Sequence, residues 1–256
     1  MRCPMPARMI LAMLVALLLS LTLPAQGKYT EVERLQRSLA IREKVLGPEH
    51  PDVAIVLNNL AVLYSDQGKD AEAEPLYQRA LAIREKVLGP EHPDVATTLS
   101  NLAFLYYTQG RYAMVEPFYQ RSLAIREKAL GPEHPDVAGS LTDLATLYQT
   151  QGRYTEAEPL YQRVLAIYEK TPGPEHPITA RGLTNLALHY HDQEKYAEAE
   201  PLFERALALW EKTLGPEHPN VATSLENYAD LLRKTDRNDE AEKLEERARA
   251  IRAITR

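Results

Sequence analysis

The chain has 256 residues, of which 45% are hydrophobic and 26% charged, and its formal net charge is −6. This is the composition of an ordinary folded chain, long enough for one large or two small domains, and nothing in it demands disorder. Affinity for nucleic acid rests largely on neutralising phosphates. An acidic chain without a cluster of Lys and Arg therefore argues against nucleic acid as a partner.

Residues 1–27 have the layout of a secretory signal peptide. Arg2 and Arg8 precede an apolar run at 9–23, and a short segment with the small residues Ala25 and Gly27 follows it. We expect cleavage after Gly27 or Ala25, and export to the periplasm or the medium. A membrane anchor through residues 9–23 is the alternative, but the run is shorter than the roughly 20 residues that a bilayer requires.

The only cysteine, Cys3, lies inside this segment. A cleaved chain would contain no cysteine, so disulfides are excluded and stability must come from packing. Cleavage after Gly27 would also remove two arginines and no acid, which leaves a formal charge of −8.

The rest of the chain is built on a 42-residue repeat. The segment Gly-Pro-Glu-His-Pro begins at 47, 89, 131, 173 and 215 without insertion or deletion. A period of this length predicts a stacked array of supersecondary units. In the second full repeat, Leu99, Leu102, Ala103 and Tyr106 lie at helical spacing, which predicts a first helix at about 93–108. A second helix is expected at about 112–130.

The loop between repeats carries stop and restart signals for helices. Gly131 supplies the left-handed position that ends one helix, and Pro132 blocks its continuation. His134 is placed to cap the next helix, with Pro135 in its first position. We therefore interpret the five loop histidines as helix caps rather than metal ligands.

Four recurring positions define a family resemblance. These are a tyrosine (Tyr64, Tyr106, Tyr148, Tyr190), a glycine four residues later (Gly68, Gly110, Gly152), a small residue (Ala73, Ala157, Ala199) and an aromatic residue (Tyr77, Tyr119, Tyr161, Phe203). Together with Ala-Ile-Arg-Glu-Lys at 40–44, 82–86 and 124–128, they resemble the kinesin light chain type of tetratricopeptide repeat over about residues 28–256. Because an export signal and not a heptad segment precedes the repeats, exported bacterial members are the better match.

The resemblance implies an all-α fold. The expected architecture is an α-solenoid, a right-handed superhelix of antiparallel helix pairs, and the expected role is a protein-binding scaffold rather than an enzyme. The repeat domain spans 28–256, with a lone helix at 29–46 followed by helix pairs at 51–88, 93–130, 135–172, 177–214 and 219–256. Polar residues such as Glu245 and Arg249 replace the apolar columns in the last helix, as a terminal cap requires.

No motif for catalysis or for a cofactor occurs in the sequence. We therefore predict no catalytic residue, no cofactor and no metal. His189 replaces a leucine of the apolar stripe and is expected to pack internally. His191, Asp192 and Asp230 form a weak metal candidate.

One face of the first helices varies from repeat to repeat, whereas the apolar stripe hardly changes. By the family resemblance, this face lines the concave groove and binds a partner; drift of a solvent face is the plainer explanation. The candidate residues are Ile55, Asn58, Val62, Thr97, Ser100, Phe104, Tyr107, Thr142, Thr146, Gln149, Arg181, Thr184, Leu188, His191, Glu226, Asp230, Arg233 and Lys234. Phe104 and Tyr107 favour binding, because large side chains exposed on such a face suggest a partner.

The predicted partner is a protein segment with a bulky apolar anchor beside charged residues. The main alternative is self-assembly through the edge of the lone helix, near Leu35, Leu39 and Ile41. A metal-dependent site around His191 is a third possibility.

Overall fold

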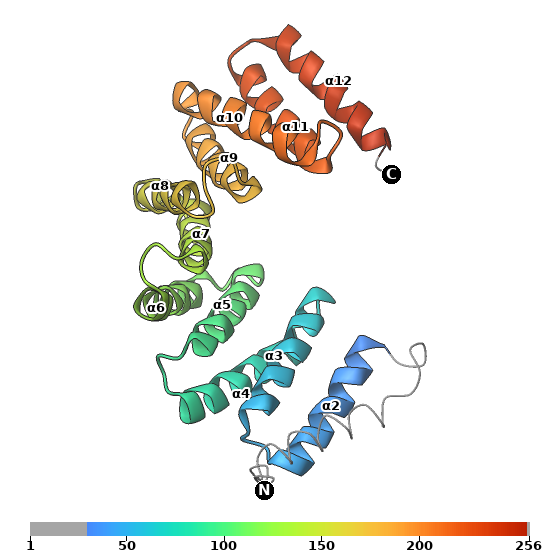
Figure 1. The fold of residues 1–256 in the computed structure, drawn as a ribbon, viewed down its shortest axis with the longest axis vertical. Helices are drawn as coiled ribbons and strands as arrows, with labels where there is room; N and C mark the ends of the chain where they lie inside the picture. Colours follow the sequence, from blue (N-terminus) through green and yellow to red (C-terminus); the bar gives the residue numbers. More distant parts are fainter. Residues whose placement is uncertain (1–29, 255–256) are drawn as a thin grey trace, which may run out of the picture. The chain divides into compact units, whose positions relative to one another are not determined.

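The computed structural model describes residues 30–254, and within this range the chain is helical, with short turns and no strand. Figure 1 shows the succession of helices. They are α2 (Glu31–Leu46), α3 (Pro51–Asp66), α4 (Asp70–Leu88), α5 (Pro93–Thr108), α6 (Tyr112–Leu130), α7 (Pro135–Thr150), α8 (Tyr154–Lys170), α9 (Pro177–Asp192), α10 (Tyr196–Leu214), α11 (Pro219–Lys234) and α12 (Asn238–Ile254). The all-α prediction is confirmed. The expected signal segment at 1–27 lies outside the described residues.

The helices alternate between a first and a second helix of each repeat. Helix α3 packs against α4, α7 against α8, α9 against α10 and α11 against α12. The observed turns fall where the repeat predicts them, except that α8 ends at Lys170, two residues before the expected end of its pair. Pro172 follows and lacks the N–H that a continuing helix needs.

A histidine caps each first helix. In all five loops the ring Nδ1 accepts a hydrogen bond from the backbone N–H two residues later, at 3.1 to 3.2 Å. The glycine before it ends the preceding second helix; Gly131, for example, has φ +86°, a conformation that L side chains rarely adopt. The interpretation of these histidines as caps is confirmed.

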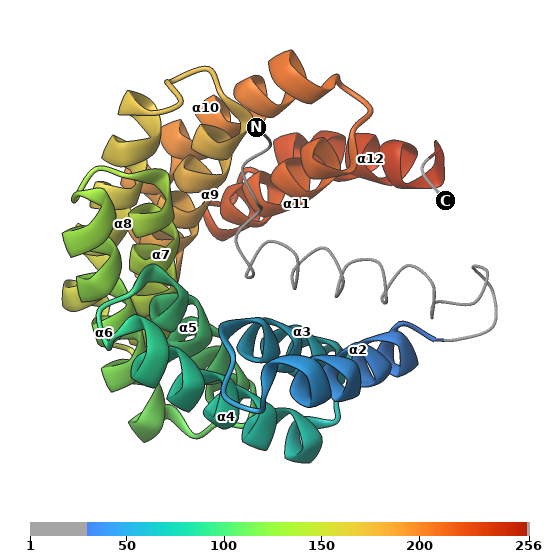
Figure 2. The same ribbon diagram turned by 60° about the horizontal axis from the view of Figure 1, so that its bottom comes forward.

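The chain divides into two compact units, residues 1–125 and 126–256, and the boundary falls within α6. In the first unit, Val53, Leu57 and Ile83 form one buried cluster, and Leu99 and Ile125 belong to another. In the second unit, three clusters line α9 to α12; they are centred on Leu183, Phe203 and Leu225. Figure 2 shows the same helices from a second direction.

Polar contacts connect successive repeats within each unit. The hydroxyl of Tyr106 on α5 donates to Glu74 Oε1 of α4 at 2.9 Å, and Arg111 donates to Glu74 Oε2 at 2.9 Å. The guanidinium of Arg111 also lies 4.1 Å from the centroid of the Tyr106 ring. In the second unit Tyr190 donates to Glu158 at 3.2 Å in the same way. In α5 and α9, the tyrosine of the repeat motif therefore links the first helix to the second helix before it.

A ladder of ion pairs runs along the second helices. Arg79 pairs with Glu43 and Arg121 with Glu85 in the first unit, each at 2.6 Å, and Arg163 with Glu127 and Arg205 with Glu169 follow in the second. Such partly exposed pairs contribute little individually, about 1 kcal/mol or less. In the part of the chain that the structure describes, no helix is long and apolar enough to cross a membrane.

Candidate partner-binding face

The candidate residues lie on the first helices α3, α5, α7, α9 and α11; we call this surface the first-helix face. In the first unit, Asn101 of α5 donates from Nδ2 to Asn58 Oδ1 of α3 at 3.2 Å. In the second, Gln149 of α7 donates to Asp192 of α9 at 2.5 Å. Within each unit, neighbouring first helices thus lie side by side and combine their side chains into one surface.

In the first unit this face is partly apolar. Phe104 is 55% exposed and Ile55 is 42% exposed, whereas Val62 is half-buried and Thr97 is exposed. Tyr107 is covered more than expected, because its ring meets that of Tyr112 edge-on with centroids 5.4 Å apart. Phe104 is therefore the principal aromatic side chain that this unit offers to a partner.

Two candidates in the first unit are engaged within the fold. Asn58 is only 6% exposed and accepts from Asn101, so our expectation that it reaches a partner is corrected. It points between α3 and α5 rather than away from both helices. Ser100 is half-buried and shares a 2.8 Å hydrogen bond with Ser122.

In the second unit, α7 contributes mostly satisfied polar groups. Thr142 donates to the carbonyl of Ala138 at 2.8 Å, and the hydroxyl of exposed Thr146 lies 3.2 Å from that of Tyr161. Gln149 is bound to Asp192, as described above. On α9, Thr184 likewise donates to the carbonyl of Ala180 at 2.9 Å.

Helices α9 and α11 carry the charged part of the face. Two of its expected charges are already paired with α12: Arg252 holds Glu226 through two bonds of 2.8 and 3.1 Å, and Glu245 holds Arg233 at 2.8 and 2.9 Å. The hydrogen bond from Arg233 lowers the pKa of Glu245.

The other charged side chains on α9 and α11 have fewer partners within the fold. Arg181, Asp230 and Lys234 are exposed, and neither Arg181 nor Lys234 has an ion-pair partner among residues 30–254. Leu188 is half-buried and packs against the cluster around Phe203. The charges available on this part of the face are therefore those of Arg181, Asp230 and Lys234, and they are of both signs.

The two histidines of α9 have different roles. His189 is fully buried, with Tyr161 and Tyr190 rings near it, and its Nε2 lies 2.7 Å from Gln193 Nε2, which confirms that it packs and hydrogen-bonds internally. Burial lowers the pKa of His189. His191 Nε2 lies 3.1 Å from Asp230 Oδ2 without forming a hydrogen bond, and its Nδ1 lies 3.7 Å from Asp192 Oδ1.

This arrangement does not support the metal alternative. Across the described residues, no group of three or more His, Cys, Asp or Glu side chains is placed to hold a metal ion, the His191 trio included. One carboxylate of that trio, Asp192, accepts instead from Gln149.

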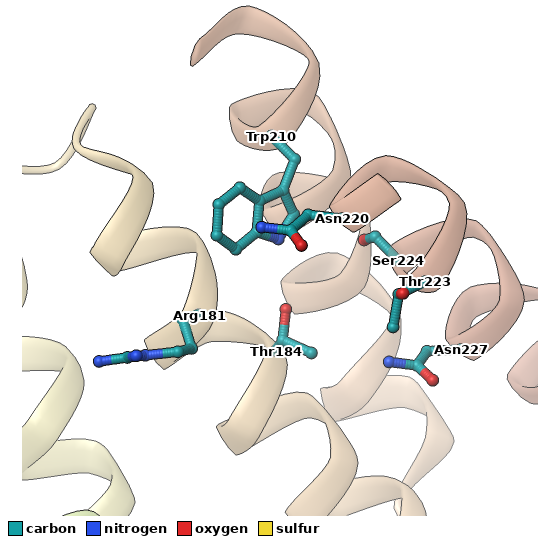
Figure 3. A pocket seen from close by; sticks show the side chains of 7 residues that line it. All are labelled: Arg181, Thr184, Trp210, Asn220, Thr223, Ser224 and Asn227. Atoms are coloured by element: carbon teal, nitrogen blue, oxygen red, sulfur yellow. The ribbon is translucent and has the colours of Figure 1, made fainter. Parts of the chain in front are cut away.

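Sequence patterns did not reveal a pocket in the second unit. It has a volume of about 210 Å³, and α9, α10 and α11 form its walls. Figure 3 shows the indole of Trp210 from α10 together with the polar side chains that α11 contributes. The lining residues are Arg181, Thr184, Trp210, Asn220, Thr223, Ser224 and Asn227. The available signal was Trp210 itself, which stands 42 residues after Tyr168 in a column where Arg42, Arg84 and Arg126 occur.

Comparison with known proteins identifies the class of protein. The tetratricopeptide repeat family model matches residues 12–86, 56–128, 94–170, 136–192 and 179–253. The chain therefore belongs to the tetratricopeptide repeat family, and its fold is an all-α solenoid of these repeats.

The solved structures refine that class. Nearly identical repeats of a protein from Podosopora anserina, named for kinesin light chain, share 34% identity with a TM-score of 0.70 over 81% of this chain and 99% of that one. The fold is also that of BtubC (BKLC) from P. vanneervenii, with 24% identity, a TM-score of 0.76, and coverage of 89% and 93%. The chain is a kinesin light chain-like tetratricopeptide repeat protein, as its motifs predicted.

A curated relative matches only locally. Nephrocystin-3 of Xenopus laevis is 51% identical over 47 residues, which are 18% of this chain and 4% of that protein. The chain thus corresponds to a small part of that relative. Tetratricopeptide repeats generally mediate protein–protein interaction, and scaffolds of the kinesin light chain type are generally not enzymes.

Proposed function

We propose that the first-helix face binds a segment of a partner protein. The observation that carries this proposal is the 55% exposure of Phe104 on α5. The stripe residues of the same helix, Leu99 and Leu102, are almost fully buried, so the fold has apolar positions available and yet leaves this ring in solvent. Exposed aromatic side chains on such a surface commonly mark interaction sites.

Each unit offers a surface of its own chemistry to a partner. Phe104 and Ile55 offer apolar surface in the first unit, which suits a bulky apolar anchor. Arg181 and Lys234 offer charge in the second unit, which suits a charged stretch. The repeat columns of the sequence predict an anchor beside charges, and this is the partner chemistry that we propose.

A peptide-display selection on the purified chain tests this proposal. Phe104→Ala should weaken the selected peptides by about tenfold or more, because buried aromatic anchors commonly contribute about 2 kcal/mol. Val87→Ala is the matched control, because Val87 is 45% exposed but lies on the second helix α4. Circular dichroism should show both variants folded.

Unchanged peptide binding by the variants would contradict the proposal. If Phe104→Ala and Val87→Ala bind every selected peptide as the parent chain does, the first-helix face is not the binding surface. Self-assembly would then be the better function, and the molar mass of the chain in solution would measure it. Leu39 of α2 already packs against the α3–α4 cluster, and Leu35 and Ile41 are half-buried, so the edge offers limited apolar area within the described residues.

We also propose that the chain is exported. The basic, apolar and small-residue succession in residues 1–27 supports this proposal. Intact-mass measurement of protein from its native compartment should give a chain beginning at Gln26 or Lys28. A chain that retains Met1 would count against cleavage.

A further inference from the structure

The Trp210 pocket contains a buried hydroxyl that has no partner. Ser224 is 2% exposed, and its Oγ forms no hydrogen bond with any described residue. Figure 3 shows this side chain on the side of α11 that borders the pocket. Buried polar groups in native proteins are nearly always paired, so an unpaired one at a pocket wall suggests a ligand that supplies the missing partner.

Comparison with other repeats explains why the hydroxyl is free. In the first unit, Arg84 donates at 2.6 Å to the hydroxyl of Thr98, which occupies the same repeat position as Ser224 three repeats earlier. In the second unit, Arg126 donates to Ser140 in the same way. Trp210 occupies the arginine position before Ser224, so the guanidinium is replaced by a flat apolar ring.

Two further substitutions make the pocket more positive than its counterparts. Asn220 stands where Asp52, Asp94 and Asp136 occur in other repeats, so a carboxylate is removed. Arg181 stands where the earlier repeats have Ile55, Thr97 and Gly139.

The resulting charge is positive although the whole chain is acidic. No carboxylate is among the residues that line the pocket, and nearby Glu226 is neutralised by Arg252. Arg181 is the one charged side chain in the lining, and it has no ion pair with any residue that the structure describes. The pocket thus favours an anionic ligand electrostatically.

The hydrogen-bonding groups of the lining lead to the same conclusion. The hydroxyls of Thr184 and Thr223 already donate to backbone carbonyls. The hydroxyl of Ser224 has no partner among the described residues, and Asn220 and Asn227 add side-chain amides, which can donate hydrogen bonds, to the lining. A carboxylate is the side-chain-sized group that accepts from several donors at once.

We propose that this pocket binds a carboxylate carried on a flat or apolar body. The body lies against the indole of Trp210, and the carboxylate accepts from Ser224 and from the amides of α11. Arg181 borders the pocket, and its guanidinium points away from Trp210 in Figure 3, so contact with the carboxylate requires a change of its rotamer. At about 210 Å³ the pocket is smaller than the roughly 300–1,000 Å³ of sites for drug-sized ligands, so it accepts a group of about one side chain.

This inference goes beyond the proposed function, because the carboxylate is either a free small acid or an acidic side chain of a partner. Trp210 is the single tryptophan of the chain, so its fluorescence reports on this pocket directly. Benzoate represents the free acid, with benzamide as its neutral counterpart. N-acetylglutamate amide represents the partner side chain, with N-acetylglutamine amide as its neutral counterpart.

We expect at least one of the two acids to change the fluorescence saturably, and its neutral counterpart to bind about tenfold more weakly, because hydrogen bonds to a charged group are the stronger ones. Response to benzoate alone indicates a free acid, and response to the blocked glutamate alone indicates a partner side chain. If each acid and its amide act equally, or neither acid acts, the proposal is wrong. Peptide selection on the first-helix face is measured independently of this result.

Substitutions in the lining distinguish binding in the pocket from a nonspecific effect of charge on the affinity for the acid. Ser224→Ala and Arg181→Gln should each weaken the acid by about tenfold. Ser140→Ala and Arg163→Gln are the matched controls, since these residues lie in the same unit but outside the pocket. Unchanged binding in both pocket variants, with circular dichroism showing them folded, would overturn the proposal.

Discussion

The guanidinium of Arg84 donates to the hydroxyl of Thr98 at 2.6 Å, and both side chains are buried. The same Nη1 donates to the carbonyl of Asp94 at 2.8 Å. Burial lowers the pKa of Arg84, so these acceptors compensate for an unfavourable environment. The contact joins the second helix α4 to the first helix α5 within the first unit.

Thr98→Val keeps the shape of the side chain and removes the acceptor of this bond. We expect a loss of about 1.5–3 kcal/mol in the free energy of unfolding, because a charged donor loses a buried partner. Ser224→Ala is the contrast, since Ser224 Oγ has no partner among the residues that the structure describes, and its removal should cost less than about 1 kcal/mol. Denaturant unfolding measures both, and equal losses would show that the Arg84 bond is not what stabilises this position.

The buried carboxyl of Asp143 should make the folded chain less stable as pH rises. Burial raises the pKa of Asp143 to about 6, although Arg126 opposes the shift. A carboxyl whose pKa is higher in the folded state binds its proton more tightly there. Its contribution is therefore complete below the unfolded pKa of about 3.9 and is lost as pH rises through about 6, by up to about 3 kcal/mol.

Asp143→Asn isolates this effect. The corresponding positions are Asn59, Asn101, Asn185 and Asn227, so the substitution restores the common residue of the column. The variant should be more stable than the parent chain above about pH 7 by roughly 1–3 kcal/mol, and nearly equal to it at about pH 4. A constant difference across this range, measured by denaturant unfolding, would contradict the assignment to Asp143.

His189 should act in the opposite direction. Its pKa is lowered by burial, so the unfolded state binds the proton more tightly. The contribution of His189 is complete above the unfolded pKa of about 6.5 and is lost as pH falls below it. His189→Leu, which restores the leucine of Leu105 and Leu147, should lose less stability on acidification than the parent chain does. Parallel pH profiles of the two proteins would rule out this role.

The apolar stripe and the loop cap should differ in their contribution to stability. Leu144 is 5% exposed, so Leu144→Ala should cost about 2–5 kcal/mol. His134→Ala removes a single cap bond, 3.1 Å long, and should cost about 1 kcal/mol. Thermal or denaturant unfolding compares them, and similar losses would mean that the loop has a further role.

The basic residues at the end of α11 should not be equivalent in partner binding. Arg233 is held by two bonds to Glu245, whereas Lys234 is exposed without an ion pair in the described part of the chain. Lys234→Ala should therefore reduce the association rate and its salt dependence more than Arg233→Ala does. Kinetic measurements with a selected peptide at two salt concentrations test this, and the reverse order would show that the Arg233–Glu245 pair opens on binding.

The 42-residue period determined most of the fold, because each repeat restates the same local signals. The glycine that ends a helix, the histidine that caps the next one and the stripe around Leu99 act over a few residues, so their spacing predicted the turns closely. The stripe also has to be buried against a neighbouring helix, which made an array of helix pairs the natural arrangement.

Only the tertiary structure decided which side chains of the first-helix face are available. Asn58 and Phe104 both belong to predicted columns of this face, yet one is bonded between helices and the other is in solvent. Periodicity gives the angle of a side chain around its own helix, but the packing of the adjacent helix decides whether that direction is open. The same holds for the Trp210 pocket. Arg181 and Trp210 are 29 positions apart in the sequence, and they line one pocket only because α9, α10 and α11 pack together.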